Sequence, residues 1–287
     1  MFQKEFQVKI GLIGKGFVGN AIYENLKSVY DFLIFDKDPS KSNSDNIRVL
    51  CHGAKIIFVA LPTPMKKDGS CDLSIILHVM AQLSYWANDN IIILKSTVQP
   101  GTCRIIKDKH PELRLVFSPE FLTEANHIED FKNCNRVIMG GDSNDVHECF
   151  KMLSDVFPKK QYLRTSLKTS EMVKYFINNF LAVKVIFANE MKQICEASGI
   201  DYEDVKDLAL HDNRIGQSHL SVPGPDGSMG FGGTCFPKDI NAMIFFAKSI
   251  GIDPSLLLET WNKNLKIRKN KDWLKMIGRA ISEKEQK

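Results

Sequence analysis

The sequence lacks the marks of a membrane or secreted protein. Its longest strongly apolar run, residues 56–61, is far shorter than the roughly 20 residues that cross a bilayer. The first seven residues include Lys4 and Glu5 but no apolar stretch of the kind that forms a secretory signal. We therefore expect no membrane association and a cytoplasmic location.

Cysteine pairs are also missing from the sequence. The seven cysteines lie at positions 51, 71, 103, 134, 149, 195 and 235, and no two of them form a C-x-x-C motif. An odd and scattered set of this kind does not indicate a disulfide framework or a zinc site. We expect no bound metal.

Most of the chain has no excess of basic charge. The net charge of +4 is concentrated in residues 266–287, which contain eight Lys or Arg against three acids. A nucleic-acid-binding protein usually carries its basic residues over a folded face, with aromatic residues between them. We interpret the basic end as a solvated helix face and expect no nucleic-acid partner.

The first part of the chain has the pattern of a parallel sheet with crossover helices. Length and ordinary composition, 287 residues with 44% apolar and 25% charged, indicate two domains. Short β-branched runs alternate with helix-like stretches over residues 1–166, which is typical of an α/β domain. We expect strands near residues 8–13, 32–35, 56–60, 91–94, 115–117, 136–139 and 161–163. Two of the helices between them are expected to start at Asp72 and at Asp142 or Ser143.

The pattern changes to all-helical after residue 166. Apolar residues recur at helical spacing over residues 168–198, and Gly199 supplies a C-terminal stop. Asp201 is expected to cap a short helix, and further helices are expected from Phe236 and from Asp253. The sequence thus predicts a doubly wound Rossmann-like α/β domain, residues 1–166, followed by an all-α domain with a long central helix, residues 167–287.

A glycine motif follows the first expected strand. It is a complete G-x-G-x-x-G, formed by Gly14, Lys15, Gly16, Phe17, Val18 and Gly19. Such glycines allow a tight turn, close approach of a pyrophosphate and close packing of helix on strand. Asp36, at the end of the next strand, is placed to accept hydrogen bonds from ribose hydroxyls, which favours NAD over NADP. Lys37 beside it weakens that preference.

One cysteine stands in a setting unlike the other six. Residues 211–234 form a long loop with two prolines and six glycines, and Cys235 follows it at the start of a helix, three residues before Lys238. A helix N-terminus and a nearby cation favour the thiolate and lower the pKa of a thiol. We therefore predict that Cys235 is a nucleophile and that the other cysteines are packing residues.

Seven segments along the chain carry a family resemblance. They occur in order and are the glycine motif, Leu61-Pro62-Thr63-Pro64, Lys95-Ser96-Thr97-Val98, Ser118-Pro119-Glu120-Phe121-Leu122-Thr123-Glu124, Lys174-Tyr175-Phe176-Ile177-Asn178, Asn213-Arg214-Ile215-Gly216, and residues 230–239 around Cys235. With these segments the chain resembles the UDP-glucose/GDP-mannose dehydrogenase family. The resemblance implies a four-electron oxidation of the C6 alcohol of a nucleotide sugar with two NAD.

The resemblance also implies catalytic roles. Cys235 would attack the C6 aldehyde to give a thiohemiacetal and then a thioester. Lys174 would stabilise the oxyanion, with Asn178 four residues on and on the same helix face. Asp239 and Thr97 would position or deprotonate the hydrolytic water. Glu124 is a second acid candidate.

Binding roles follow from the same resemblance. Besides the glycine motif, Asp36 and Lys37, the cofactor residues are Pro62, Thr63, Thr97 and Glu120. The substrate residues are Glu120, Phe121, Leu122, Lys174, Asn178, Phe231, Gly232, Gly233 and Arg214. Since Arg214 matches an arginine that reaches the partner subunit's site, a homodimer with a shared active site is implied. The long helix, if apolar on an exposed face, is an independent reason to expect it.

Three questions stay open at the level of sequence. Family members usually continue into a third nucleotide-binding domain that we expect these 287 residues to lack, so a non-catalytic or partner-dependent NAD-binding subunit is an alternative. A β-hydroxyacid dehydrogenase, which needs no nucleophilic thiol, is a less favoured one. The Phe-Pro-Lys-Asp sequence at 236–239 indicates UDP-glucose or GDP-mannose as substrate, and overall likeness favours UDP-glucose.

Overall fold

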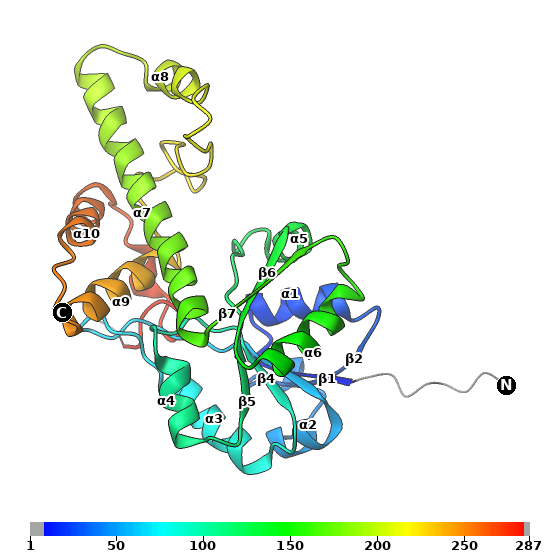
Figure 1. Ribbon diagram of the computed structural model, residues 1–287. Coiled ribbons are helices and arrows are strands. Elements are labelled where there is room, and N and C mark those ends of the chain that lie inside the picture. Colours follow the sequence, from blue (N-terminus) through cyan, green and yellow to red (C-terminus); the bar gives the residue numbers. More distant parts are fainter. Residues whose placement is uncertain (1–8, 284–287) are drawn as a thin grey trace. The chain divides into compact units, whose positions relative to one another are not determined.

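The computed structural model describes residues 9–283 and divides them into two compact units (Figure 1). The sheet unit comprises residues 9–63 and 73–174, and the helical unit comprises residues 64–72 and 175–283. Val8 of the first expected strand and the end of the basic tail, residues 284–287, lie outside the described residues.

The sheet unit contains one seven-stranded sheet. The strands are β1 (Lys9–Ile13), β2 (Asp31–Phe35), β3 (Ile56–Val59), β4 (Ile91–Leu94), β5 (Arg114–Phe117), β6 (Arg136–Gly140) and β7 (Gln161–Thr165). Their order across the sheet is β2-β1-β3-β4-β5-β6-β7. All seven expected strands are confirmed to within two residues. The sheet is parallel except where β6 meets β5, an antiparallel contact through Phe117 and Gly140.

Alternate side chains of the strands enter two cores on opposite faces of the sheet. In β4, Ile91 and Ile93 pack on one face, and Ile92 and Leu94 pack on the other. One core is covered by α1 (Phe17–Leu26), α5 (His127–Asn133) and α6 (Ser143–Ser154), and the other by α2 (Ile47–Gly53), α3 (Ser74–Trp86) and α4 (Thr102–Lys109) (Figure 1). This is the doubly wound arrangement that the sequence predicts.

The long helix α7 (Leu167–Ala197) runs from the sheet unit into the helical unit. The expected boundary at residue 166 therefore falls eight residues before the observed one, because the first turns of α7 pack within the sheet unit. Glu171 accepts hydrogen bonds from the backbone N–H groups of Gly101 and Cys103 at 2.5 and 2.7 Å. Gly140 lies so close that a Cβ there would be 2.2 Å from the Ser170 hydroxyl.

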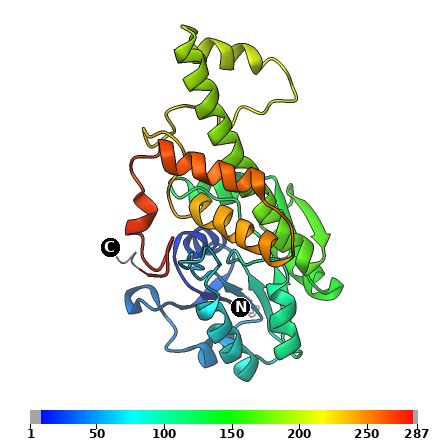
Figure 2. The same cartoon turned by 90° about the vertical axis from the view of Figure 1, so that its left-hand side faces the viewer.

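The helical unit also contains α8 (Tyr202–Ala209), α9 (Phe236–Ser249), α10 (Ser255–Ile267) and the 3₁₀ helix η2 (Asp272–Lys275). Figure 2 shows α9 and α10 side by side. The starts expected for α8 and α9 are confirmed, and Asp201 caps α8 by accepting from the Glu203 N–H. No described helix is both long and apolar enough to span a bilayer.

A hairpin after β3, residues 64–72, belongs to the helical unit. Its Met65 pairs with the C-terminal segment, donating to the carbonyl of Ala280 at 2.9 Å and accepting from the N–H of Ser282 at 2.8 Å. The expectation that Asp72 caps the following helix is wrong, because α3 begins at Ser74 with Leu73 in the cap position. The N–H of Asp72 instead donates to Pro64 and closes the hairpin.

Candidate active site

The glycine turn after β1 needs glycine for two different reasons. Gly14 has a φ of +88°, and a Cβ there would lie 2.4 Å from the carbonyl of Ala60. A Cβ on Gly19 would lie 1.9 Å from the carbonyl of Gly14, so this glycine lets α1 pack on the turn. Gly16 has no atom within 4 Å of its Cβ position, which leaves open space where a pyrophosphate would approach.

Asp36 is fixed beside this turn at the end of β2. One carboxylate oxygen accepts from the Lys15 N–H at 2.6 Å, and the other accepts from the Asp38 N–H at 2.9 Å. Each oxygen keeps a further lone pair for a ribose hydroxyl. The Lys15 ammonium lies over the ring of Tyr23, 3.8 Å from its centroid.

Three further predicted segments follow β3, β4 and β5 at the same carboxyl edge of the sheet. The buried Thr63 hydroxyl donates to the carbonyl of Thr97 at 2.7 Å, and the Leu61 N–H donates to the Ser96 hydroxyl at 2.8 Å. Ligands of doubly wound sheets bind at this edge. The structure thus brings the predicted cofactor residues of the sheet unit together.

Two buried lysines hold the loop after β5. Lys174, 3% exposed, pairs with the Glu120 carboxylate at 2.9 Å and donates to the Glu120 carbonyl at 2.7 Å. Lys95 donates to the Ser118 hydroxyl and to the Pro119 carbonyl, both at 3.0 Å. Glu120 also accepts from the Leu122 N–H at 2.8 Å. The predicted cation Lys174 is therefore fixed in place before any ligand binds.

Burial and the neighbouring charges act in opposite directions on the pKa values of Lys95 and Glu120. Burial lowers the pKa of Lys95 to about 8, although the neighbouring Glu120 opposes the shift. Burial alone would raise the pKa of Glu120, but Lys174 and the Leu122 N–H hold it below its usual value. A cavity of about 50 Å³ is lined in part by Lys95, Glu120, Leu122 and Lys160.

Cys235 occupies the N-cap of α9 and is partly exposed. Gly233, with a φ of +73°, turns the chain into this position, and Pro237 lies in the first turn of the helix. The Thr234 hydroxyl lies 3.7 Å from the Cys235 sulfur. The predicted placement of the thiol at a helix N-terminus is what the structure has.

A buried carboxylate lies one turn into the same helix. Asp239, 1% exposed, accepts from the Asn178 amide at 2.6 Å and pairs with the Lys238 ammonium at 2.5 Å. Burial alone would lower the pKa of Lys238, but Asp239, Cys235 and Cys71 raise it above its usual value. A permanent cation therefore stands beside both the thiol and the carboxylate.

Other predicted residues lie in different surroundings. Glu124 lies in a turn that follows residues 118–123, which form no helix. The Arg214 side chain is 88% exposed and forms a two-pronged pair with Asp212. The Phe231 ring is buried against Phe236 and Trp261, and its backbone N–H and carbonyl are both bonded to the Asn264 side chain.

Several residues of the cluster were not predicted as site residues. The sequence predicts Lys238 only as a cation near Cys235, and it does not mark Asn264, Arg268 and Asp272, which contact the loop before Cys235. The position of Lys238 three residues after the cysteine was the one available signal. The other three act across more than 30 residues of sequence, and no local pattern marks them.

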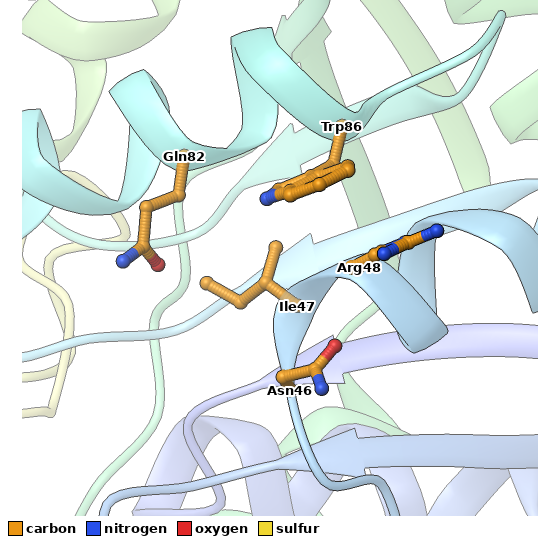
Figure 3. A pocket seen from close by; sticks show the side chains of 5 residues that line it. All are labelled: Asn46, Ile47, Arg48, Gln82 and Trp86. Carbon is orange, nitrogen blue, oxygen red and sulfur yellow. The ribbon is translucent and has the colours of Figure 1, made fainter.

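A separate pocket of about 250 Å³ lies elsewhere on the sheet unit (Figure 3). Trp86 and Gln82 of α3 face Ile47 and Arg48 of α2, and the Arg48 guanidinium stacks 4.9 Å from the Trp86 ring. The lining contains no acid–base pair. Within residues 9–283 no group of three His, Cys, Asp or Glu side chains is arranged to hold a metal, and no disulfide joins two of the cysteines.

Two family models match the chain. Residues 41–159 match the NAD binding domain and residues 168–266 match the central domain of the UDP-glucose/GDP-mannose dehydrogenase family. The chain belongs to this family. The resemblance seen in the sequence is confirmed, and NAD is the cofactor. The open face of Gly16 and the fixed carboxylate of Asp36 fit that cofactor.

Relatives and solved structures agree with the family. The UDP-glucose 6-dehydrogenase of Rickettsia felis is 36% identical over 211 residues, which cover 71% of this chain and 46% of the relative. This chain spans about half the length of the curated relatives that it matches. A UDP-glucose dehydrogenase structure from Pyrobaculum islandicum has a TM-score of 0.80 at 23% identity, covering 93% of this chain and 70% of that one.

The fold alone does not separate the competing functions. A 3-hydroxyisobutyrate dehydrogenase structure from Mycobacterium tuberculosis has a TM-score of 0.72 at 17% identity, covering 91% of this chain and 94% of that one. At such identities the likeness shows the fold only. The family models, not the fold, distinguish a nucleotide-sugar dehydrogenase from a hydroxyacid dehydrogenase.

Proposed function

We propose that this chain oxidises the C6 alcohol of UDP-glucose to the carboxylate of UDP-glucuronate, using two NAD. The observation that carries the proposal is the partly exposed Cys235 at the start of α9, beside the partly buried Lys238 and the buried Asp239. Membership of the family and the names of the relatives support a nucleotide sugar as substrate.

The thiol makes the second oxidation possible. When bound, NAD accepts the hydride that leaves C6 in each oxidation. The Cys235 thiolate adds to the C6 aldehyde and forms a C–S bond, which converts the aldehyde into a thiohemiacetal. Loss of the second hydride leaves a thioester. Lys174, a buried cation already fixed by Glu120, is suited to stabilise the oxyanion on the sugar.

Hydrolysis then restores the free enzyme. Water attacks the thioester carbon, the C–S bond breaks, and the electron pair returns to the Cys235 sulfur as a thiolate. Asp239 takes the proton of the water, with Thr97 as the second group that positions it. The Asn178 amide and the Lys238 ammonium hold the Asp239 carboxylate in one orientation. A preorganised base of this kind costs no rearrangement when the water arrives.

We assign cofactor binding to the carboxyl edge of the sheet unit. The pyrophosphate would lie over Gly16, where the N-terminus of α1 offers backbone N–H groups without a capping side chain. Asp36 would accept the ribose hydroxyls and disfavour a 2′-phosphate. Pro62, Thr63, Thr97 and Glu120 complete this edge.

We further propose a homodimer that shares its active sites. Three phenylalanines of α7, at positions 176, 180 and 187, are 71, 60 and 61% exposed. Their spacing of four and seven residues puts them on one helix face, and an apolar face of this kind marks a protein interface. Arg214, exposed on a loop of the helical unit, would then reach the substrate bound by the partner.

Substitution of the nucleophile tests the reaction class. The Cys235→Ala variant should form no UDP-glucuronate while it binds NAD as the wild type does. A hydroxyacid dehydrogenase would keep its activity in this variant, because its chemistry needs no thiol. The proposal would be overturned if the wild type oxidised 3-hydroxyisobutyrate and the Cys235→Ala variant kept that activity.

A second candidate function is a partner-dependent NAD-binding subunit, which the match of residues 41–159 to the family's NAD binding domain also supports. On this reading the purified chain binds NAD but turns over UDP-glucose only when a further protein is added. Turnover by the purified chain alone would exclude it.

A further inference from the structure

One buried amide holds the loop that precedes Cys235. The Asn264 side chain, 0% exposed, accepts from the Phe231 N–H at 2.8 Å and donates to the Phe231 carbonyl at 3.0 Å. A single side chain thus satisfies both hydrogen-bonding groups of one loop residue. The preceding Gly230 N–H donates to the Asn189 side chain at 3.0 Å.

An ion pair between the buried Arg268 and the partly buried Asp272 holds the next part of the same loop. One carboxylate oxygen of Asp272 accepts from the Gly233 N–H at 2.9 Å, and the other accepts from the Arg268 guanidinium at 3.0 Å. Arg268 is only 2% exposed and also donates to the Asn270 carbonyl at 2.9 Å. The guanidinium is therefore fixed and in turn fixes Asp272.

These side chains explain two of the glycines. A Cβ on Gly232 would lie 2.2 Å from the Asp272 carboxylate and 2.3 Å from the Arg268 guanidinium. A Cβ on Gly230 would lie 2.4 Å from the Asn264 amide oxygen. Glycine is required here by the residues that hold the loop, independently of any substrate.

We propose that Asn264, Arg268 and Asp272, the loop clamp, are positioning residues for Cys235. The inference rests on the proposed nucleophilic role of that thiol. By fixing the backbone of residues 231–233, the clamp sets where the chain enters α9 and so holds the thiol at the helix N-terminus near Lys238. Arg268 and Asp272 lie past residue 266, where the match to the family's central domain ends.

The chain offers a matched control for the charge of the clamp. Asp226, 51% exposed in its side chain, also accepts from the Arg268 guanidinium, at 2.6 Å. Both Asp226 and Asp272 pair with Arg268, but the Gly233 N–H is bonded to Asp272. Asp226→Asn therefore removes only one carboxylate from Arg268. Asp272→Asn also disturbs the loop, because the NH₂ group of the new amide would face either the Gly233 N–H or the Arg268 guanidinium, and both of these are donors.

The experiment compares the rate of iodoacetamide alkylation at Cys235, measured by peptide mass spectrometry across pH, in wild type, D272N and D226N. We expect D272N to slow alkylation at least tenfold and to move its pH midpoint upward, because the thiolate loses its helix N-terminus. We expect kcat to fall by about 10- to 100-fold, as for a small misplacement of a reacting group, with NAD affinity unchanged. D226N should react as the wild type does.

A second variant covers the case in which D272N does not fold by circular dichroism. Asn264→Asp keeps the shape but puts a carboxylate oxygen against the Phe231 carbonyl, so it should slow alkylation of Cys235 in the same way. Wild-type alkylation rates in a folded D272N or N264D protein would overturn the clamp. If the wild type shows no turnover but D272N still slows alkylation, the clamp stands and the proposed function fails.

Discussion

Asp239 and Lys95 are both buried ionisable residues, and their surroundings give them opposite uses. The Asn178 amide and the Lys238 ammonium each bind one oxygen of the Asp239 carboxylate and hold it in one orientation, and each oxygen keeps a further lone pair for a water. The Lys95 ammonium has only neutral oxygens as hydrogen-bond partners, and burial therefore lowers its pKa. The first residue is suited to chemistry, and the second makes folding depend on pH.

Replacing the Asp239 carboxylate should stop the reaction at the thioester. In Asp239→Asn the amide cannot take the proton of the attacking water, so hydrolysis should slow by about 10²–10⁴-fold. The first turnover should still release NADH, and intact-mass spectrometry should find the acyl adduct on Cys235. Lys238→Met is the control, because it leaves the Asp239 carboxylate and its hydrogen bond from Asn178 in place. This variant should accumulate less of the adduct than Asp239→Asn does. An adduct-free Asp239→Asn enzyme with normal turnover would remove Asp239 from the mechanism.

Lys95 should make the sheet unit more stable as pH rises above 8. Its folded pKa of about 8 lies below the ordinary value of 10.5, so between these values the unfolded chain binds more protons. Stability should therefore rise over this window and be lowest below pH 8. The groups that face Lys95 are Glu120, Cys134, Lys174 and Lys160.

Urea unfolding of the wild type and Lys95→Met checks this at pH 7.5 and 9.5. The wild type should gain about 2 kcal/mol relative to the variant over this interval, since one pKa unit corresponds to 1.36 kcal/mol. An equal pH response in the two proteins would show that Lys95 keeps an ordinary pKa in the folded state.

At the scale of elements, patterns within one segment were predictable and pairings between distant segments were not. The alternation in β4 and the helical spacing in α7 follow from periodicity, which a single stretch of sequence contains. The pairing of Met65 with Ala280 joins residues more than 200 positions apart, and nothing in either segment marks the other. The same holds for the site: Cys235 and the glycine turn were identified by local context, whereas Asn264 was not.

The turn between β1 and α1 allows ligand binding to be separated from packing. Gly16 has a φ of −78° and open space at its Cβ position, so Gly16→Ala should keep its melting temperature while it blocks the pyrophosphate and weakens NAD binding at least tenfold. Gly19→Ala places its methyl group against the Gly14 carbonyl and should lower the melting temperature by several degrees. Calorimetric NAD titration and thermal melts measure the two effects. Unchanged NAD affinity in a folded Gly16→Ala protein would remove the glycine turn from the cofactor site.

At the scale of the whole molecule, the proposed function needs a second copy of the chain. The phenylalanine face of α7 is exposed in one chain, and Arg214 has only Asp212 as its ion-pair partner among the described residues. A dimer through α7 would cover the apolar face and give the arginine a role in the partner's site. The resemblance at Arg214 implies a dimer, but only the structure shows which side of α7 is exposed.

A charge in the middle of the α7 face should therefore break the dimer. Phe180→Glu should elute as a monomer in size-exclusion chromatography with light scattering, and turnover should fall with the dimer. Leu256→Glu, at a side chain that is 67% exposed on α10, is the matched control and should stay dimeric. A dimeric Phe180→Glu protein, or a monomeric wild type with full activity, would contradict this assembly.

In the proposed mechanism one chain performs both oxidations through Cys235. This is tested by the amount of NADH formed per UDP-glucose consumed by the purified wild type, with the products identified by mass spectrometry. We expect two NADH for each UDP-glucuronate and no free aldehyde. One NADH per sugar, with the aldehyde as product, would show a two-electron enzyme and contradict the thioester mechanism.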